Sequence, residues 1–462
     1  MSQVSISFLG ATETVTGSRF LISDGQTKIL VDAGLFQGTR EIKDKNWEPF
    51  PVEPSSIDAI VLTHAHLDHS GYLPLLVKQG FEGNIYCTEY SAKLASVILQ
   101  DSARIQVEDA KFARKKGYSR HKDPQALYDE QDALQAIKLF KVCKFDQEIN
   151  VENKASLQFY HSGHILGSAF VSIELSNKKF LFTGDMGRPT HPVLVSPDEF
   201  PAGQFDAVIT ESTYGDRTHE KPTGEFENVI NQTIDRGGIV LIPAFAVDRT
   251  EVILVELREL MESGKIPRVP IFVDSPMALT ALDFYREALN AGRSEIREDV
   301  IAQWRGRDPF DPGTLEERRT VEDSKSLNDQ RTPCIIVSAS GMATGGRVVH
   351  HLARLLPDAK NTILLVGYQA AGTRGRQLEN GEKRIRIFGE DVPVRAQIAN
   401  ADTFSVHADG DELINWLKKA SQPKQVFVVH GEIESADIFA KRIRTDLGWN
   451  AIVPKPEQTF NV

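Results

Sequence analysis

The feature that most constrains this chain is a short run of histidine and aspartate directly after an apolar segment. The sequence Thr-His-Ala-His-Leu-Asp-His-Ser-Gly occupies residues 63–71 and follows the strand-like segment 59–62. Zn²⁺ prefers nitrogen and oxygen donors in a tetrahedral arrangement, and residues two apart in an extended turn can converge on one ion while the next two turn toward another. A solvated polar turn is the alternative, but three imidazoles and a carboxylate at this spacing favour a metal site. The predicted ligands are His64, His66, Asp68 and His69.

Two later segments supply further donors that a complete metal site needs. His164 lies in the glycine-flanked loop 161–168, where backbone freedom lets an imidazole reach inward, and Asp185 ends an apolar strand in the glycine-flanked turn 181–187. Either residue alone is more often a hydrogen-bonding or capping residue. Together with the histidine-rich turn they predict a complete set of metal donors, in which the Asp185 carboxylate could bridge two ions.

Length and charge limit how the chain can act. Its 462 residues suit two hydrophobic cores, or one core interrupted by another. The 53 Lys and Arg residues against 64 Asp and Glu residues give a net charge of −11, which is the wrong sign for a protein that coats nucleic acid nonspecifically. Any contact with nucleic acid is therefore expected to be local.

Cysteine usage and the N-terminus indicate a cytoplasmic protein. Cys87, Cys143 and Cys334 are far apart and form no CxxC pair, so neither a disulfide framework nor a thiolate metal site is expected. The chain runs from Met1 directly into a strand-like segment, without a basic start and an apolar stretch, and no apolar run approaches membrane-spanning length. We therefore expect a soluble protein that is not exported and does not bind membranes.

Apolar periodicity divides the chain into the segments of an α/β protein. Short strand-like segments dominate the first part, and two helical segments interrupt them. From about residue 216 strands and helices alternate, which is typical of a parallel sheet. The polar and charged segment 291–330 is expected to be a helical or irregular excursion. Strands are expected in the first part at 4–8, 20–22, 28–32, 59–63, 156–160, 168–175 and 179–183, helices at 91–116 and 124–141, and in the last part strands at 395–399 and 425–429 and helices at 411–419 and 435–447.

These motifs resemble the metallo-β-lactamase superfamily. Its successive motifs are matched by Asp32, by the histidine-rich turn at 64–69, by His164 and by Asp185. The resemblance implies an αββα sandwich, a fold that periodicity alone does not establish. It also implies that Asp32 is not a ligand but orients the metal-binding turn; an ordinary turn at the end of a strand is the alternative for this residue.

The last metal ligand of the family is expected far along the chain, which implies an inserted domain. The histidine in a matching strand-end context is His430, and the alternating region before it resembles the β-CASP domain. Three short motifs that accompany this domain are present, around Glu211, His407 and His430. We therefore expect a first part of the metallo-β-lactamase domain at 1–215, an inserted parallel-sheet β-CASP domain at 216–395, and the last part of the first domain at 396–462.

The resemblance implies a two-zinc hydrolase with Asp68, His407 and Glu211 as its catalytic residues. A hydroxide shared by two Zn²⁺ ions would attack phosphorus, His407 would protonate the leaving ribose oxygen, and Glu211 would hold His407 protonated and oriented. Mn²⁺ is a second candidate for the same donors. One ion is expected at His64, His66, His164 and Asp185, and the other at Asp68, His69, Asp185 and His430.

The same resemblance favours RNA as the substrate. DNA-processing relatives typically lack histidine at the last position, whereas RNA-processing members keep it, as this chain does at His430. The inserted domain has glycine-rich turns that lead into helices and could present backbone N–H groups to phosphate, and the family places RNA in a cleft between the two domains. The expected contacts to single-stranded RNA are Arg249, Ser338, Ser340, Gly341, Arg374 and Ser405.

The sequence also allows other functions. A small-molecule metallohydrolase, such as a thioesterase or lactonase, would use the same ions but would not need Glu211, His407 or the inserted domain. A DNA-directed β-CASP nuclease is a further alternative, and a non-catalytic scaffold would be expected to have lost metal ligands that this chain retains. The motifs separate neither endonucleolytic from 5′–3′ exonucleolytic cutting nor a monomer from a homodimer.

Overall fold

The computed structural model describes residues 3–116, 123–151, 154–219, 224–370, 372–401 and 404–462. The chain forms two units, of which the first comprises Met1–Thr218 and His407–Val462 and the second His219–Val406. The second unit is therefore inserted into the first.

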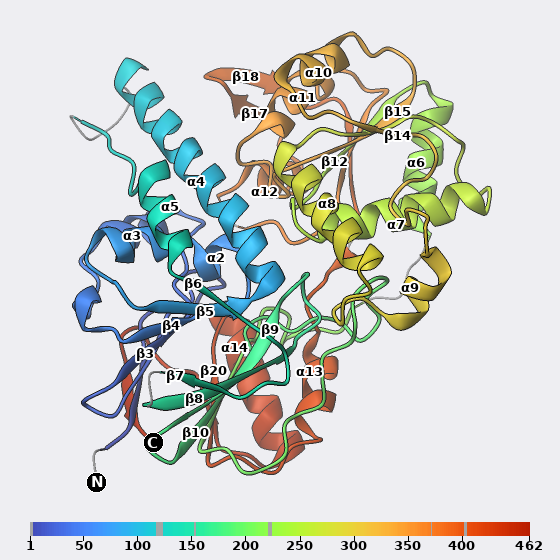
Figure 1. The fold of residues 1–462 in the computed structure, drawn as a ribbon. Helices are drawn as coiled ribbons and strands as arrows, with labels where there is room; N and C mark the ends of the chain where they lie inside the picture. Colours follow the sequence, from blue (N-terminus) through green and yellow to red (C-terminus); the bar gives the residue numbers. More distant parts are fainter. Residues whose placement is uncertain (1–2, 117–122, 152–153, 220–223, 371, 402–403) are drawn as a thin grey trace. The chain divides into compact units, whose positions relative to one another are not determined.

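The first unit is built on two seven-stranded mixed sheets that enclose a common core (Figure 1). Along strand β8 buried and partly exposed residues alternate, as expected where one face of a sheet packs on the core. One sheet has the order β22 (Thr459–Asn461), β1 (Ser5–Phe8), β2 (Phe20–Ser23), β3 (Lys28–Val31), β4 (Ala59–Val61), β5 (Asn84–Thr88), β6 (Phe140–Cys143). The other has the order β21 (Ala451–Ile452), β20 (Gln425–Val428), β11 (Ala207–Thr210), β10 (Lys178–Phe182), β9 (Ala169–Leu175), β8 (Ala155–His161), β7 (Ile149–Val151).

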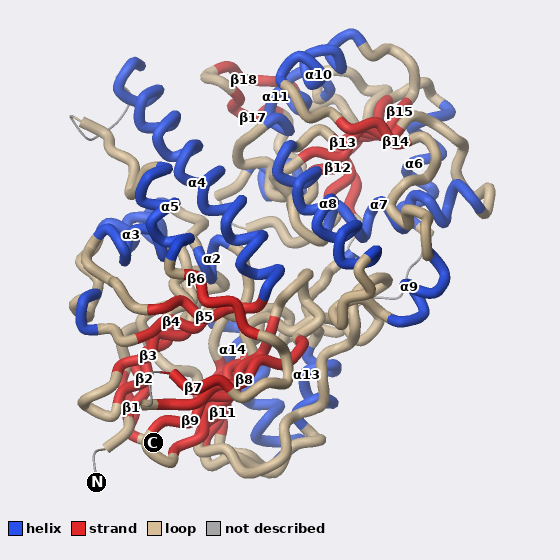
Figure 2. Tube along the Cα trace, in the orientation of Figure 1, coloured by secondary structure: helices blue, strands red, loops and turns tan. Residues whose placement is uncertain are grey.

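Helices cover the outer faces of both sheets, as Figure 2 shows. On the second sheet α13 and α14 bury Leu413, Leu417 and Phe439 against residues of β10, β11 and β20. The predicted αββα sandwich is therefore confirmed. The helices of this unit are α1 (Arg40–Asp44), α2 (Leu67–Ser70), α3 (Leu73–Lys78), α4 (Glu89–Lys116), α5 (Glu130–Lys138), α13 (Gly410–Leu417) and α14 (Ile433–Arg442).

The second unit has a six-stranded sheet in which every neighbouring pair is parallel, as the alternating pattern predicted. A separate antiparallel hairpin packs on the same core. The sheet order is β14 (Leu315–Glu317), β13 (Ile271–Val273), β15 (Cys334–Ser338), β12 (Ile239–Pro243), β16 (Thr362–Leu365), β19 (Gln397–Asn400), and the hairpin is β17 (Arg384–Ile387) with β18 (Glu390–Pro393). The helices are α6 (Glu225–Asp235), α7 (Arg249–Glu262), α8 (Pro276–Asn290), α9 (Glu298–Trp304), α10 (Val321–Ser326), α11 (Arg347–Leu355) and α12 (Arg374–Glu379).

The structure differs from the sequence prediction at several boundaries, and the inserted unit begins at His219 rather than at residue 216. The inserted unit ends after Val406 rather than after residue 395, because β19 pairs with β16 of the inserted sheet. The helix expected at 124–141 is only α5, because the Asp129 side chain accepts hydrogen bonds from the backbone N–H groups of Gln131 and Asp132 and so caps its start, while β6 follows its end.

Among the described residues, no helix has the length and apolar character needed to cross a membrane.

Candidate metal centre

The expected ligands all follow strands that end at the same edges of the two sheets. Within the second sheet β10, β11 and β20 are parallel neighbours, so Asp185, Glu211 and His430 leave their strands at one edge. In the first sheet β3 and β4 are parallel, and Asp32 and the turn at 63–71 follow them in the same way. The strand topology therefore brings together residues that are far apart in the sequence.

The four side chains of the first predicted ligand set lie close enough together to bind one ion. His64, His66, His164 and Asp185 place their donor atoms within 4.8 Å of one another. His66 Nδ1 lies 3.1 Å from His64 Nε2 and 3.3 Å from His164 Nε2. Asp185 Oδ2 lies 3.5 Å from His64 Nε2 and 3.6 Å from His164 Nε2. Donors at the corners of a tetrahedron around zinc are about 3.4 Å apart, so this group fits the ion.

The second predicted set lies on the other side of Asp185. His69 Nε2 is 3.1 Å from His430 Nε2 and 3.2 Å from Asp185 Oδ1, and His430 Nε2 is 3.7 Å from Asp68 Oδ2. The two oxygens of Asp185 thus face different groups of histidines, which fits a shared ligand. The site can hold divalent cations with both donor sets.

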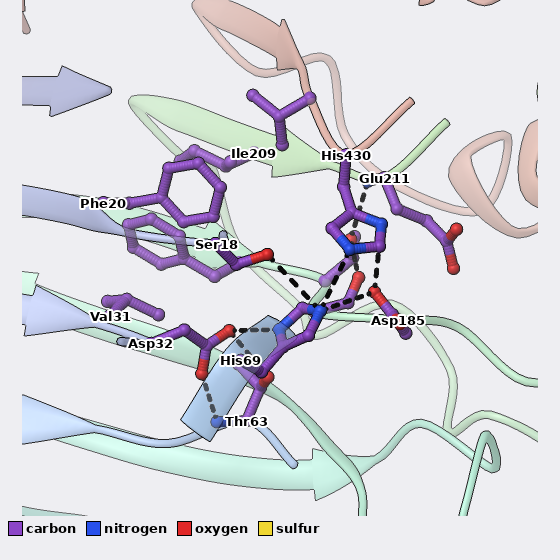
Figure 3. Close-up of a pocket in the computed structure, with 14 residues that line it drawn as sticks. Ser18, Phe20, Val31, Asp32, Thr63, His69, Asp185, Ile209, Glu211 and His430 are labelled. Atoms are coloured by element: carbon purple, nitrogen blue, oxygen red, sulfur yellow. Dashed lines mark hydrogen bonds and ion pairs between the residues drawn. The ribbon is translucent and has the colours of Figure 1, made fainter. Parts of the chain in front are cut away.

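Hydrogen bonds around Asp32 fix which nitrogen of two ligands faces the centre. Asp32 Oδ2 accepts from the Thr63 hydroxyl and from His69 Nδ1, both at 2.8 Å. Because the Thr63 hydroxyl donates to Asp32, it accepts from His64 Nδ1 at 3.2 Å. Nε2 of both histidines is then the atom that faces the centre. The sequence expectation for Asp32 therefore has a structural basis in this network, part of which is drawn in Figure 3.

His430 is oriented by a residue that sequence reasoning missed. The Thr213 hydroxyl donates to the His430 carbonyl oxygen and lies 3.1 Å from His430 Nδ1, which leaves Nε2 for the centre. Thr213 lies in the same segment as Glu211, but a threonine after a strand carries no signal of its own. Ser18, whose hydroxyl is 3.4 Å from His69 Nε2, was missed for the same reason.

The electrostatics of the centre suit metal binding. Burial, and then the neighbouring His69, lower the pKa of His64 well below its usual value, and burial with His407 does the same for the pKa of His164. Burial alone would lower the pKa of His69, but the carboxylates of Asp185 and Asp32 raise it well above its usual value. A cation held by the second group would therefore replace the proton at His69 Nε2.

Apolar side chains close the inner side of the centre. The pocket that His69, Asp185 and His430 face is also lined by Phe20 and Ile209, with Val31, Phe182 and Val429 (Figure 3). These residues belong to the core between the two sheets. In such surroundings charges interact more strongly than in water, because little solvent screens them.

Close backbone packing holds the histidine-rich turn in place. The backbone N–H groups of Ser18, Ala33 and Leu35 donate to the carbonyl oxygens of Asp68, His69 and Leu67. A Cβ at Gly34 would come 1.6 Å from the Asp68 carbonyl oxygen, so only glycine allows this approach.

A histidine–carboxylate pair stands beside the metal ligands. His407 Nδ1 is 3.3 Å from Glu211 Oε2, and Glu211 Oε1 accepts a hydrogen bond from Met186 N at 2.6 Å. The Glu211 side chain is completely buried, whereas that of His407 is 17% exposed. His407 Nε2 lies 3.9 Å from Asp185 Oδ2, so this atom is on the metal side of the ring. The geometry allows His407 to exchange protons with solvent and with a group bound at the centre.

The six expected RNA contacts lie in the second unit, and two of them are used inside it. Arg249 is buried and donates from Nη1 to the Val366 carbonyl oxygen, and the Ser338 hydroxyl donates to the Asp274 carbonyl oxygen at 2.9 Å. Both side chains thus make hydrogen bonds within the second unit, and their contact with substrate stays a prediction.

The other four expected contacts differ from one another in their hydrogen bonds and packing. The Ser340 hydroxyl is 3.0 Å from that of Thr344, and Arg374 donates to the carbonyl oxygens of Thr344 and Arg386 at 2.9 and 3.1 Å. A Cβ at Gly341 would come 2.8 Å from the Phe245 ring. The Ser405 hydroxyl is buried and has no hydrogen-bond partner among the described residues.

Replacing Asp32 with asparagine is expected to weaken metal binding by roughly 10- to 100-fold, the usual effect of losing such a partner of a ligand. Asp32 uses both oxygens as acceptors, Oδ1 for Thr63 N and Oδ2 for the Thr63 hydroxyl and His69 Nδ1, and the NH2 group of asparagine can replace neither of them, so the network that orients the ligands is broken at one side. The measurement is metal content in competition with a chelator of known affinity, with Asp24→Asn as the control on a carboxylate remote from the centre. Equal affinity of Asp32→Asn and the unaltered protein would contradict the role given to Asp32.

Three protein-family models match the chain. The Metallo-beta-lactamase superfamily model matches residues 15–222, the Beta-Casp domain model matches 250–378, and the Zn-dependent metallo-hydrolase RNA specificity domain model matches 391–454. A structure of a protein of unknown function from Enterococcus faecalis V583 is similar in fold, with a TM-score of 0.55 at 12% identity over 100% of both chains.

Curated relatives are similar over nearly the whole chain. Ribonuclease TTHA0252 of Thermus thermophilus is 35% identical over 92% of this chain and 92% of its own length. An RNase J-like protein of Methanocaldococcus jannaschii is 31% identical over 98% of both chains. Transcription termination factor FttA of Methanosarcina mazei is 30% identical over 93% of this chain and 67% of its own length.

Proposed function

The chain belongs to the β-CASP branch of the metallo-β-lactamase superfamily and is a metal-dependent hydrolase, and from this premise we propose that it cleaves single-stranded RNA. The family membership confirms the resemblance seen in the sequence. Relatives named ribonuclease and RNase J-like protein align with it over more than nine tenths of its length, which supports RNA as the substrate.

We infer that two zinc ions work in this centre, one held by each of the two donor sets that share Asp185. When bound, the ions would lower the pKa of water so that hydroxide is available at neutral pH, and they would place positive charge beside the phosphodiester. Mn²⁺ is a second candidate, since the donors are nitrogen and oxygen atoms only. The proposed sets are His64, His66, His164 and Asp185 for one ion, and Asp68, His69, Asp185 and His430 for the other.

The observation that carries the proposal is the pair formed by His407 and Glu211. Cleavage of a phosphodiester leaves a ribose oxygen that needs a proton, and His407 Nε2 is turned toward the metal side while Nδ1 is 3.3 Å from Glu211. Glu211 is itself fixed by Met186 N, so the ring is held in one orientation. After donating, His407 can regain a proton from solvent through its exposed part.

The remaining expected residues are assigned supporting roles. We propose that the partly exposed Asp68 carboxylate, besides binding metal, orients the attacking water. The proposed contacts for the RNA strand are Arg249, Ser338, Ser340, Gly341, Arg374 and Ser405. Cleavage within the strand is proposed as the main mode, with 5′–3′ exonucleolytic cutting as a second mode of the same chemistry.

The test is a panel of substrates given to the zinc-loaded protein. We expect cleavage of end-labelled single-stranded RNA, little cleavage of the matching DNA, and no hydrolysis of a thioester. A circular single-stranded RNA has no ends, so its opening detects internal cutting, and linear RNA with a 5′-phosphate reports trimming from the end. Protein stripped with a chelator is the matched control. Preference for the thioester or for DNA would overturn the RNA proposal.

A further inference from the structure

The hairpin of the second unit has an unusual residue at its turn. Strand β17 pairs with β18 up to Ile387 and Glu390, so Phe388 and Gly389 form a two-residue connection. Both have positive φ, 52° for Phe388 and 86° for Gly389. Two-residue hairpin turns with positive φ at both positions favour Asn-Gly, because a large side chain is strained in this conformation.

Phe388 is also exposed to solvent. Its exposed fraction is 62%, the highest among the large hydrophobic side chains of the described residues. The phenylalanine therefore does not lower the backbone strain of the turn, and most of its side chain is not buried in the core. A strained and exposed aromatic residue that does not help folding points to a role in binding.

The hairpin holds this ring on a rigid base. Ile385, Ile387 and Val392 are buried in the core of the second unit, together with Leu378 of α12. The Arg374 side chain donates from Nε to the Arg386 carbonyl oxygen at 3.1 Å, which ties α12 to β17. The turn is thus the end of an anchored element rather than a loose loop.

The outward face of the hairpin carries positive charge beside the ring. Residues of β17 alternate between exposed and buried, so Arg384 and Arg386 point to the side opposite Ile385 and Ile387. Asp391 is the acidic residue across the strand, 3.6 Å from Arg386, and both side chains are more than half exposed, so this ion pair contributes little and can be exchanged. Arg384 also donates from Nη2 to the Asp391 carbonyl oxygen at 2.8 Å. This face therefore carries two guanidiniums and one carboxylate next to an exposed aromatic ring, while the exposed Glu390 lies opposite Ile387 in the other register.

A second ring supports Phe388 from one side. The imidazole of His350, an exposed residue of α11, lies with its centroid 4.6 Å from that of Phe388 at an angle of 37°. Contact on one face and 62% exposure leave the Phe388 ring accessible for stacking. Stacking on aromatic rings with arginine beside them is how many proteins hold single-stranded nucleic acid.

We propose that Phe388, His350, Arg384 and Arg386, together called the hairpin tip, bind single-stranded RNA, with a base stacked on Phe388 and the two arginines against phosphates. The inference rests on the proposed function and extends it, because it assigns an RNA-binding surface outside the metal centre. The charge of the arginines favours RNA over an apolar protein partner, which would desolvate both guanidiniums without supplying an anion.

The test uses the fact that the residue best suited to the turn cannot stack. In the zinc-loaded protein carrying His407→Ala to slow cleavage, Phe388→Asn is expected to weaken binding of a fluorescently labelled single-stranded RNA of about 20 nucleotides by roughly 10-fold. The melting temperature is expected to stay the same or rise, since asparagine suits the turn. Phe388→Trp should keep the affinity, and Phe112→Ala, which removes another exposed aromatic ring, should not change it.

Charge removal gives an independent test that leaves the turn untouched. Arg384→Gln with Arg386→Gln is expected to lower the affinity and to make the dependence of binding on salt less steep, because fewer phosphates are neutralised. Unchanged RNA affinity in Phe388→Asn, or in the double arginine variant, would overturn the hairpin tip while RNA cleavage by the unaltered protein still supports the proposed function. If the unaltered protein neither binds nor cleaves RNA, both proposals fall.

Discussion

Asp185→Asn is expected to lower the rate of RNA cleavage by roughly 10³-fold or more and to reduce the bound metal to one ion per chain or fewer. Each Asp185 oxygen faces a different donor group, Oδ2 at 3.5 Å from His64 Nε2 and Oδ1 at 3.2 Å from His69 Nε2. Asparagine has one carbonyl oxygen and no negative charge, so it cannot serve both groups. Metal ions supply several kcal/mol of transition-state stabilisation, and each 1.36 kcal/mol is tenfold in rate.

The carboxylate at this position is already charged before metal arrives. Burial alone would raise the pKa of Asp185, but His430, His69 and His64 lower it well below its usual value. Metal content by mass spectrometry of the native protein, together with single-turnover cleavage, checks the prediction. Asp206→Asn is the control on a carboxylate of the same sheet that pairs with lysines away from the centre. Retention of both ions and of the cleavage rate in Asp185→Asn would contradict the shared-ligand assignment.

The positions of the metal ligands were largely predictable because each of them follows a strand. The spacing within the turn at 63–71, and the strings around Asp185 and His430, locate the ligands without knowledge of the sheet order. What the sequence could not provide is the pairing of β10, β11 and β20, since contacts between residues far apart in the chain depend on the whole fold. Thr213 and Thr63 act through hydrogen bonds to ligand histidines, and a threonine has no sequence signature for that role.

The second unit shows where local patterns fail. The segment 291–330 was expected to be a helical or irregular excursion, and it contains α9 and α10, but it also contains β14, which adds an edge strand beside β13. Arg249 and Ser338 are expected to contact RNA, and the structure shows that both side chains also donate to carbonyl oxygens of their own unit. A side chain's choice between the interior and a ligand depends on neighbours from distant strands, which local sequence does not encode.

His407→Ala is expected to reduce RNA cleavage by a factor on the order of 10² or more while the metal content stays that of the unaltered protein. His407 Nε2 is 3.9 Å from Asp185 Oδ2, but His407 belongs to neither of the two donor sets. Binding of the ions is therefore expected not to depend on His407. Loss of the proton donor should lower the cleavage rate most for substrates whose leaving oxygen must be protonated, as the ribose oxygen of RNA must. The measurement is the cleavage rate of RNA under saturating zinc, with metal content determined on the same samples.

A change of leaving group separates proton donation by His407 from a merely structural role. A phosphodiester with a nitrophenolate leaving group needs no protonation, so His407→Ala should hydrolyse it at close to the rate of the unaltered protein. Glu211→Gln keeps an oxygen for Met186 N but loses the charge that holds His407, so it should lower RNA cleavage by a smaller factor in the same leaving-group-dependent way. If His407→Ala slows both substrates equally, or loses metal, then His407 acts by supporting the centre and the proton must come from elsewhere.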